Sequence, residues 1–172
     1  MRLAYMPDSH FGTYDQKIPD RREVSAAAEQ LLEEAQTAER VGFDGVWLAE
    51  RHARTETFFP SPVVLAAAIA ARTSGIEIAT TVIQPTYYHP VHLAEQLALI
   101  DQLSKGRLIF GAGVGYHPDY FNLFGVPLKR SGKRFEETME IIRGVWTQER
   151  FSFKGEFFDF QDILLTPKPY QQ

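Results

Sequence analysis

The chain has 172 residues, 44% of them hydrophobic, which is enough for one globular domain with its own core, so we expect residues 1–172 to form a single domain. Its net charge of -4 comes from 22 acidic and 18 scattered basic residues, which argues against nucleic acid as a partner. The lack of cysteine fits a reducing compartment. The longest apolar run, Val63 to Ala71, is shorter than the roughly 20 residues that are needed to span a bilayer. We therefore expect a soluble cytoplasmic protein.

Short apolar runs alternate with segments of helical periodicity along the chain. In chain order we predict a strand at Leu3 to Met6, a helix at Val24 to Val41, a strand at Gly45 to Ala49, a helix at Val63 to Arg72 opened by Ser61-Pro62, a strand at Glu77 to Ile83, a helix opened by Pro90, a strand at Leu108 to Val114, and a helix at Phe135 to Trp146. Gly42 stands where the first helix should end in a left-handed residue. Phenylalanines around Lys154-Gly155-Glu156 predict a β-hairpin, and a Pro-rich tail follows from Thr166 to Gln172.

The predicted strands show no polar alternation, which indicates a parallel sheet buried on both faces. Four βα units can belong to a closed barrel or to an open doubly wound sheet, and periodicity leaves both architectures open. A closed barrel has eight strands and typically ~250 residues, so this chain would supply about half of one.

Polar and aromatic residues follow each predicted strand, at the carboxyl ends where parallel α/β proteins bind ligands. These residues are Asp8, His10 and Phe11, then Glu50, Arg51 and His52, then Thr80, Thr81, Gln84 and His89, and finally Gly111, Gly113, Gly115, Tyr116 and His117. All five histidines lie in these segments or at the helix start just beyond one. We interpret the clustering as a ligand-binding mouth, and the general preference of histidine for loops is the alternative.

Two of these features suggest other kinds of site. The run Gly111 to Gly115 has the wrong spacing and position for a dinucleotide fingerprint, so it favours close approach of a planar ligand to the backbone. His89 and His92 lie three residues apart at a helix start, as in a metal-dependent hydrolase. No carboxylate or third histidine joins them at an obvious spacing, so we favour packing at the helix start and expect no metal.

The stretch Val46 to His52 resembles the strand-two signature of the bacterial luciferase-like family of flavin-dependent oxidoreductases. The resemblance continues through Thr86 to Pro90, Leu103 to Tyr116, Asp119 to Tyr120, Phe124 to Pro127, Arg130 to Glu137, Trp146, Phe153 to Phe157 and Pro167 to Pro169. It covers essentially the whole chain and stops where family members usually begin the fifth strand. It therefore implies an α/β fold of parallel TIM-barrel type, made of the first four βα units (a half barrel) plus a C-terminal β-hairpin.

The resemblance implies reduced FMN, or in sister branches a deazaflavin, at the strand carboxyl ends. There a monooxygenase would use O₂ to oxidise a small organic substrate, with a flavin reductase as a partner. Catalytic roles would fall on Glu50, Arg51 and His52, with His52 as a candidate acid/base for the flavin peroxide or the substrate. Many members have two adjacent histidines here, so Arg51 alters the expected proton transfer and could instead bind an anionic group.

The resemblance also implies contacts to cofactor and substrate. Cofactor contacts would come from Asp8, Thr80, Thr81, Gly113, Val114 and Tyr116, and substrate contacts from His10, Phe58 and His117. At the end of strand three the family often has a bulge against the flavin ring, sometimes with a non-proline cis bond. Val114 stands where some members carry an arginine for the phosphate, and much of the phosphate and ribityl site would belong to a second half-barrel.

A half barrel exposes two strand edges and an apolar sheet face. We therefore expect a homo-oligomer. A non-catalytic half-barrel that serves as a pairing module is the alternative from another functional class.

Overall fold

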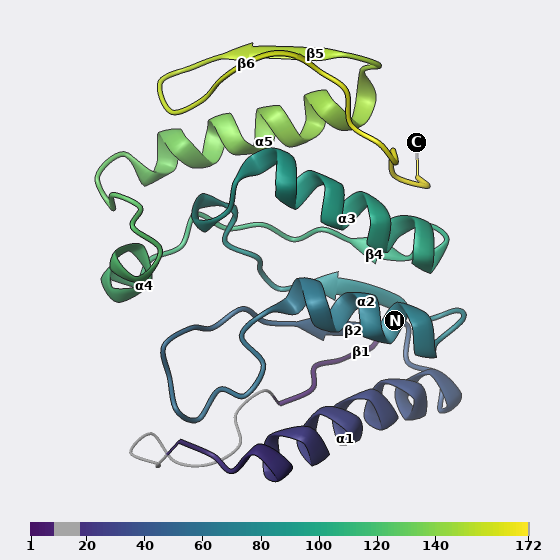
Figure 1. Ribbon diagram of the computed structural model, residues 1–172. Helices are drawn as coiled ribbons and strands as arrows, with labels where there is room; N and C mark the ends of the chain where they lie inside the picture. The colour runs from purple at the N-terminus through teal and green to yellow at the C-terminus, as the bar shows by residue number, and fades with distance from the viewer. Residues whose placement is uncertain (9–17, 172) are drawn as a thin grey trace. The chain divides into compact units, whose positions relative to one another are not determined.

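The computed structural model describes residues 1–8 and 18–171, which fall into two compact units (Figure 1). The first unit comprises Met1–Ile83 and Arg107–Gly111, and the second comprises Gln84–Gly106 and Ala112–Gln172. Among the described residues, no helix combines the length and the hydropathy that crossing a membrane requires.

The first unit contains a four-stranded sheet in the order β1, β2, β3, β4, with every neighbouring pair parallel. Its strands are β1 (Ala4–Tyr5), β2 (Gly45–Leu48), β3 (Glu77–Thr80) and β4 (Leu108–Ile109). This confirms the predicted parallel α/β arrangement. The third and fourth strands end earlier than predicted, since their regular pairing stops at Thr80 and Ile109. Beyond these residues, the backbone N–H of Ile83 donates to the carbonyl of Gly111 at 3.0 Å.

The two faces of this sheet differ in burial. Val46, Ile78 and Leu108 are aligned in register and all buried. Helices α1 (Arg21–Arg40) and α2 (Pro62–Arg72) both contact β2, and α2 also contacts β3. On the other face the register aligns Trp47 with Ile109 through β3, and these side chains are 44% and 45% exposed. The prediction that the strands are buried on both faces is therefore wrong for these positions.

Local capping explains where the helices of the first unit begin. Helix α1 (Arg21–Arg40) starts three residues before the predicted Val24, because Asp20 and Glu23 form a capping box. In this box the Asp20 side chain accepts from the backbone N–H of Arg22 at 2.8 Å, and the Glu23 side chain accepts from the backbone N–H of Asp20 at 3.2 Å. Gly42 adopts the predicted left-handed conformation, with φ +88°. Helix α2 (Pro62–Arg72) begins after the predicted cap, Ser61.

The amino end of the sheet is tied together by Arg107, which directly precedes β4. Its guanidinium donates to the carbonyls of Ala70, Thr73 and Ile76 and to the Thr73 hydroxyl, at distances of 2.9 to 3.1 Å. Burial lowers the pKa of Arg107, and the Glu39 carboxylate opposes that shift. One side chain therefore satisfies the backbone acceptors at the end of α2 and the start of β3.

We expect Arg107→Lys to lower the free energy of unfolding by about 2 kcal/mol, because an ammonium cannot reproduce the planar fork of donors and leaves buried carbonyls unpaired. The matched control is Arg72→Lys, since Arg72 pairs with Glu29 at the surface at 2.9 Å and should change stability by less than about 0.5 kcal/mol. Urea unfolding followed by far-UV circular dichroism compares the two. Equal midpoints would contradict the assigned role of Arg107.

The second unit is built around two helices and a hairpin. It contains the 3₁₀ helix η1 (Pro85–Tyr87), α3 (Pro90–Ser104), α4 (Pro118–Leu123), α5 (Ser131–Thr147), β5 (Phe151–Lys154) and β6 (Asp159–Ile163). Helix α3 packs against α5, and the antiparallel β5-β6 hairpin lies on the other side of α5 (Figure 1). The hairpin is confirmed, whereas η1 and α4 are too short to show the periodicity that predicts a helix.

A buried carboxylate on α5 anchors the hairpin turn. Glu137 is 1% exposed, and its two oxygens accept from the backbone N–H groups of Glu156 and Phe157 at 2.8 and 2.9 Å. A Cβ on Gly155 would lie 2.4 Å from this carboxylate. The turn therefore requires both the acid and the glycine.

Candidate functional site

An acid–imidazole pair lies directly after β2. The Glu50 side chain is fully buried and that of His52 is 11% exposed, and 3.1 Å separates Glu50 Oε1 from His52 Nε2. The pair therefore places an imidazole beside a buried carboxylate at the carboxyl end of the sheet, where the proposed role of His52 requires it.

Arg51 lies between these two residues and is half-buried. Its Nε atom is buried and makes no hydrogen bond to any residue in the described part of the chain. A buried guanidinium N–H without a partner is costly, and an oxygen of a bound ligand would satisfy it. Its environment fits the binding of an anionic group.

At the end of β3, Thr80 bonds to the segment that follows β4. The Thr80 side chain is buried, donates to the Gly111 carbonyl at 2.8 Å and accepts from the Gly111 N–H at 3.0 Å. Because its hydroxyl makes both of these hydrogen bonds, Thr80 links β3 to the segment after β4, and its predicted contact with a cofactor stays a prediction. A Cβ on Gly111 would lie 2.1 Å from the Thr80 carbonyl oxygen, so the close neighbour of this glycine is protein backbone.

Beyond Thr80 the chain makes a turn that presents an apolar side chain. Thr81 is half-buried, and its N–H donates to the Leu48 carbonyl at 2.7 Å. The Thr81–Val82 peptide bond is cis, at the place where the resemblance implies such a bond. Val82 is 42% exposed, so it is the residue that this turn presents. Sequence reasoning did not single out Val82, and its only signal there is its place after Thr81.

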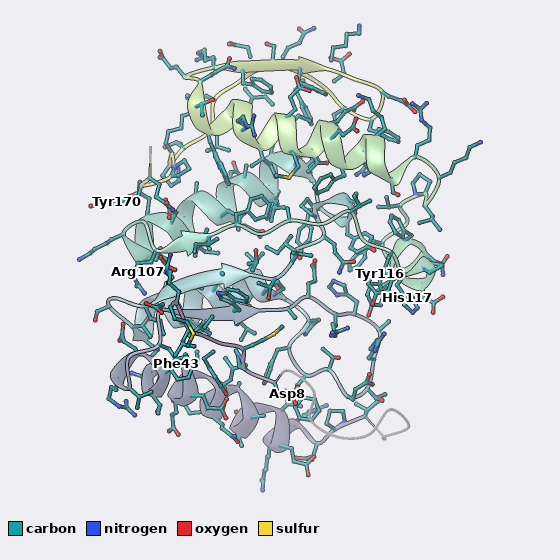
Figure 2. The ribbon with its side chains drawn as sticks, turned by 180° about the vertical axis from the view of Figure 1, so that it is seen from behind. Asp8, Phe43, Arg107, Tyr116, His117 and Tyr170 are labelled. Carbon is teal, nitrogen blue, oxygen red and sulfur yellow. The ribbon has the colours of Figure 1, made fainter. Side chains whose placement is uncertain are left out.

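Predicted site residues of the second unit gather before α4. Gly113 and Val114 are half-buried, and the Val114 carbonyl accepts from the Thr86 hydroxyl at 2.6 Å. Tyr116 is 69% exposed and lies beside His117 (Figure 2). His117 precedes α4 and stacks on Tyr120, with ring centroids 4.8 Å apart. This segment presents an exposed aromatic ring next to an imidazole.

The remaining predicted contacts lie in the first unit or outside the described residues. Asp8 is exposed and lies at the opposite end of the sheet from Arg107 (Figure 2). Phe58 is half-buried, contacts Phe59 edge-to-face at 6.2 Å, and lines a cavity of about 360 Å³. His10 lies outside the described residues.

Of the two histidines at the start of α3, His89 makes packing contacts. The His89 ring contacts Phe158 and Phe160 edge-on, with centroids 6.3 and 5.5 Å apart, and His92 is exposed. Within residues 1–8 and 18–171, no three potential ligand side chains gather in a way that could hold a metal ion.

Comparison with known proteins gives a match along nearly the whole chain. Residues 5–172 match the family described as luciferase-like monooxygenase. Limonene 1,2-monooxygenase of Rhodococcus erythropolis is 35% identical over 84% of this chain and 37% of its own length. The oxygenase component of the flavin-dependent trigonelline monooxygenase of Acinetobacter baylyi is 28% identical over 91% and 44%. An F420-dependent glucose-6-phosphate dehydrogenase of Amycolatopsis mediterranei is 32% identical over 85% and 47%.

A solved structure supports the same relationship at the level of the fold. The monooxygenase RslO1 from Streptomyces bottropensis is similar with a TM-score of 0.90 and 29% identity, over 100% of this chain and 51% of that one. The chain therefore spans about half of that structure and less than half of the three curated relatives, 37 to 47% of their lengths. This confirms the expected similarity to one half of a larger barrel.

Proposed function

Because the chain belongs to the luciferase-like monooxygenase family, we propose that it supplies the first four βα units of an oxidoreductase that uses reduced FMN and O₂ to oxidise a small organic substrate. The family contains flavin-dependent and F420-dependent members. One relative is named as an oxygenase component, which favours a separate reductase as the source of reduced flavin.

The buried Glu50–His52 pair carries this proposal. Its 3.1 Å contact lies after β2, at the carboxyl end of a parallel sheet, where such folds place their reacting groups. His52 would hold or transfer a proton at Nε2, and Glu50 would orient the ring. The bound flavin would supply the electrons that activate O₂.

Two further features of the first unit fit a flavin. The Nε of Arg51, which has no hydrogen-bond partner among the described residues, suits an anionic oxygen of the cofactor. The exposed Val82 side chain offers an apolar contact for a flat ring. Arg51 and Val82 would therefore hold the cofactor, while Glu50 and His52 manage the proton.

Titration of the purified 172-residue chain with oxidised FMN, and anaerobically with reduced FMN, tests the proposal through flavin fluorescence and absorbance. We expect saturable binding that Arg51→Ala weakens by about tenfold, the loss expected for one hydrogen bond to a charged group. The control Arg40→Ala removes an exposed guanidinium from the end of α1 and should leave the affinity unchanged. Absence of binding of both flavin forms at ~1 mM would remove cofactor use by this chain alone.

A deazaflavin is the alternative cofactor, supported by the F420-dependent relative that is 32% identical to the chain. The same titration with F420 separates the two. Tighter binding of F420 than of FMN would assign the chain to the deazaflavin branch.

A pairing module is the second candidate function, favoured by the exposed strand side chains Trp47 and Ile109. It predicts a stable homo-oligomer that carries no flavin. Size-exclusion chromatography monitored at protein and flavin wavelengths distinguishes it from a flavin-binding chain.

A further inference from the structure

In the second unit, a buried hydroxyl holds the 113–117 segment, which directly precedes α4. Thr86 lies in η1, is 0% exposed, and donates from Oγ1 to the Val114 carbonyl at 2.6 Å. Its neighbours in η1, Pro85 and Tyr87, are buried as well. A short hydrogen bond from a buried donor is strong, and a donor on a packed element cannot follow a moving acceptor. Thr86 therefore restricts the backbone at Val114.

The same region leaves no room for a side chain in the middle of the segment. Gly115 has a φ of +87°, and a Cβ there would lie 2.5 Å from the Tyr87 hydroxyl oxygen and 3.0 Å from Gln84 Oε1. The Tyr87 hydroxyl donates to Gln84 Oε1 at 3.3 Å, and the Tyr87 ring stacks on Phe124 with centroids 5.1 Å apart. Because these groups are packed and bonded to each other, they confine the backbone at Gly115.

The far end of the segment is anchored to α4. The His117 ring stacks on Tyr120 at 4.8 Å, and Tyr120 is 2% exposed in a cluster with Tyr87 and Phe121. Tyr116 lies between the two anchored ends and is 69% exposed. A large aromatic ring therefore projects from a backbone that is held on both sides. A ligand that contacts this ring would not have to order the segment, which lowers the entropic cost of binding.

A further contact fixes Thr86 itself. The Nε of Arg134, on α5, donates to the Thr86 carbonyl at 3.0 Å. The guanidinium carbon of Arg134 lies 4.6 Å from the centre of the Phe158 ring, within the range of a cation–π contact. A series of contacts thus leads from the hairpin turn through Arg134 and Thr86 to Val114.

We propose that Thr86 is a positioning residue, which fixes the 113–117 segment so that the Tyr116 ring is presented to the bound flavin. The proposal rests on the proposed flavin-dependent function only for the identity of the ligand. The order of the segment is a property of the chain alone. Because Thr86 is fully buried, it acts on the ligand only through this segment.

Hydrogen–deuterium exchange of the 172-residue chain without flavin tests whether Thr86 fixes the segment. Thr86→Val keeps the side-chain shape and removes the donor. We expect the amides of residues 113–117 to exchange about fivefold faster, the factor that one hydrogen bond contributes to a local opening equilibrium. Thr86→Ser keeps the hydroxyl and should exchange like the wild type.

The matched control is Thr147→Val, which removes the hydroxyl that donates to the Arg143 carbonyl at 2.9 Å on the exposed end of α5. It should leave exchange in residues 113–117 unchanged. Unchanged exchange of this segment in Thr86→Val would overturn the proposal. Equally faster exchange in α3 would overturn it too, because that result would show a general loss of stability in the second unit.

Gly115→Ala displaces the same segment and leaves the Thr86 hydroxyl in place. Its matched control is Gly125→Ala, because Gly125 also has a left-handed φ, +64°, but a Cβ there would meet nothing within 4 Å. We expect faster exchange of residues 113–117 in Gly115→Ala and no change in Gly125→Ala. Equal exchange in the two variants would show that Tyr87 and Gln84 do not confine the segment, and the proposal would lose its basis.

A double-mutant cycle in FMN affinity tests whether Thr86 acts through Tyr116. We expect Thr86→Val and Tyr116→Ala each to weaken FMN binding about fivefold, and the combined variant to bind no more weakly than Tyr116→Ala alone. Losses that multiply to about 25-fold would show independent actions and would overturn the link to Tyr116. If the wild type binds no FMN, the proposed function fails, whereas the exchange measurements still decide whether Thr86 positions the segment.

Discussion

Gly111→Ala is expected to destabilise the first unit by about 3 kcal/mol, the upper part of the usual range for overpacking a buried site. The added Cβ would lie 2.1 Å from the Thr80 carbonyl oxygen. That neighbour is backbone and cannot rotate away, so β3 and the segment after β4 must separate. Separation also breaks both hydrogen bonds between the Thr80 hydroxyl and the Gly111 backbone. Urea unfolding monitored by circular dichroism measures the loss.

Gly132→Ala is the control for this substitution. Gly132 lies in the first turn of α5, and a Cβ there would meet nothing within 4 Å. Alanine loses less conformational entropy on folding than glycine, so this variant should gain up to about 1 kcal/mol. If Gly111→Ala unfolds at the same urea concentration as the wild type, the close approach of the Thr80 carbonyl does not exist in solution.

Glu137→Gln is expected to cost about 2 to 3 kcal/mol at pH 7. A glutamine amide offers only one oxygen, so one of the two N–H groups of Glu156 and Phe157 would be left facing an NH₂ donor. The matched control is Glu136→Gln, because the Glu136 side chain is 70% exposed and only 3.7 Å from Lys133 at the surface. That control should change stability by less than about 0.5 kcal/mol. Equal effects of the two variants would contradict the anchoring role.

The pH dependence of the Glu137 contribution gives a second test. Burial raises the pKa of this carboxyl, but backbone N–H groups at Glu156 and Phe157 together with Lys133 outweigh burial and lower the pKa overall. The stabilisation is therefore complete above the ordinary pKa of about 4.3 and is lost as the pH falls through the lowered pKa of the folded state. The difference in unfolding free energy between wild type and Glu137→Gln should be constant from pH 7 to 5 and shrink below about pH 4. A difference that grows on acidification would have the wrong sign.

Much of the first unit could be predicted from local signals. The apolar runs around Val46 and Ile78 identified parallel strands, and Ser61 and Gly42 marked helix ends, because caps and periodicity involve only neighbouring residues. Asp20 with Glu23 is an equally local signal that places the start of α1 and was overlooked. The resemblance added the family and the half-barrel architecture, because periodicity alone left a closed barrel and an open doubly wound sheet as alternatives.

The roles of individual side chains depended on contacts between distant parts of the chain. Thr80 is the last residue of β3, a position where ligand-binding residues occur, yet its hydroxyl hydrogen-bonds to the backbone of Gly111, 31 positions later. Val82 was not singled out, because its exposure depends on the turn that follows β3.

What the sequence by itself determined is the order of βα units, their parallel direction and the family, since these follow from local patterns and from motifs read along the chain. What only the tertiary structure decided is which groups remain available to a ligand. No described residue hydrogen-bonds to the buried Nε of Arg51, Glu50 is buried against His52, and the segments around Val24 and Phe58 line an open pocket. Packing between segments far apart in sequence sets these properties, and no local pattern encodes it.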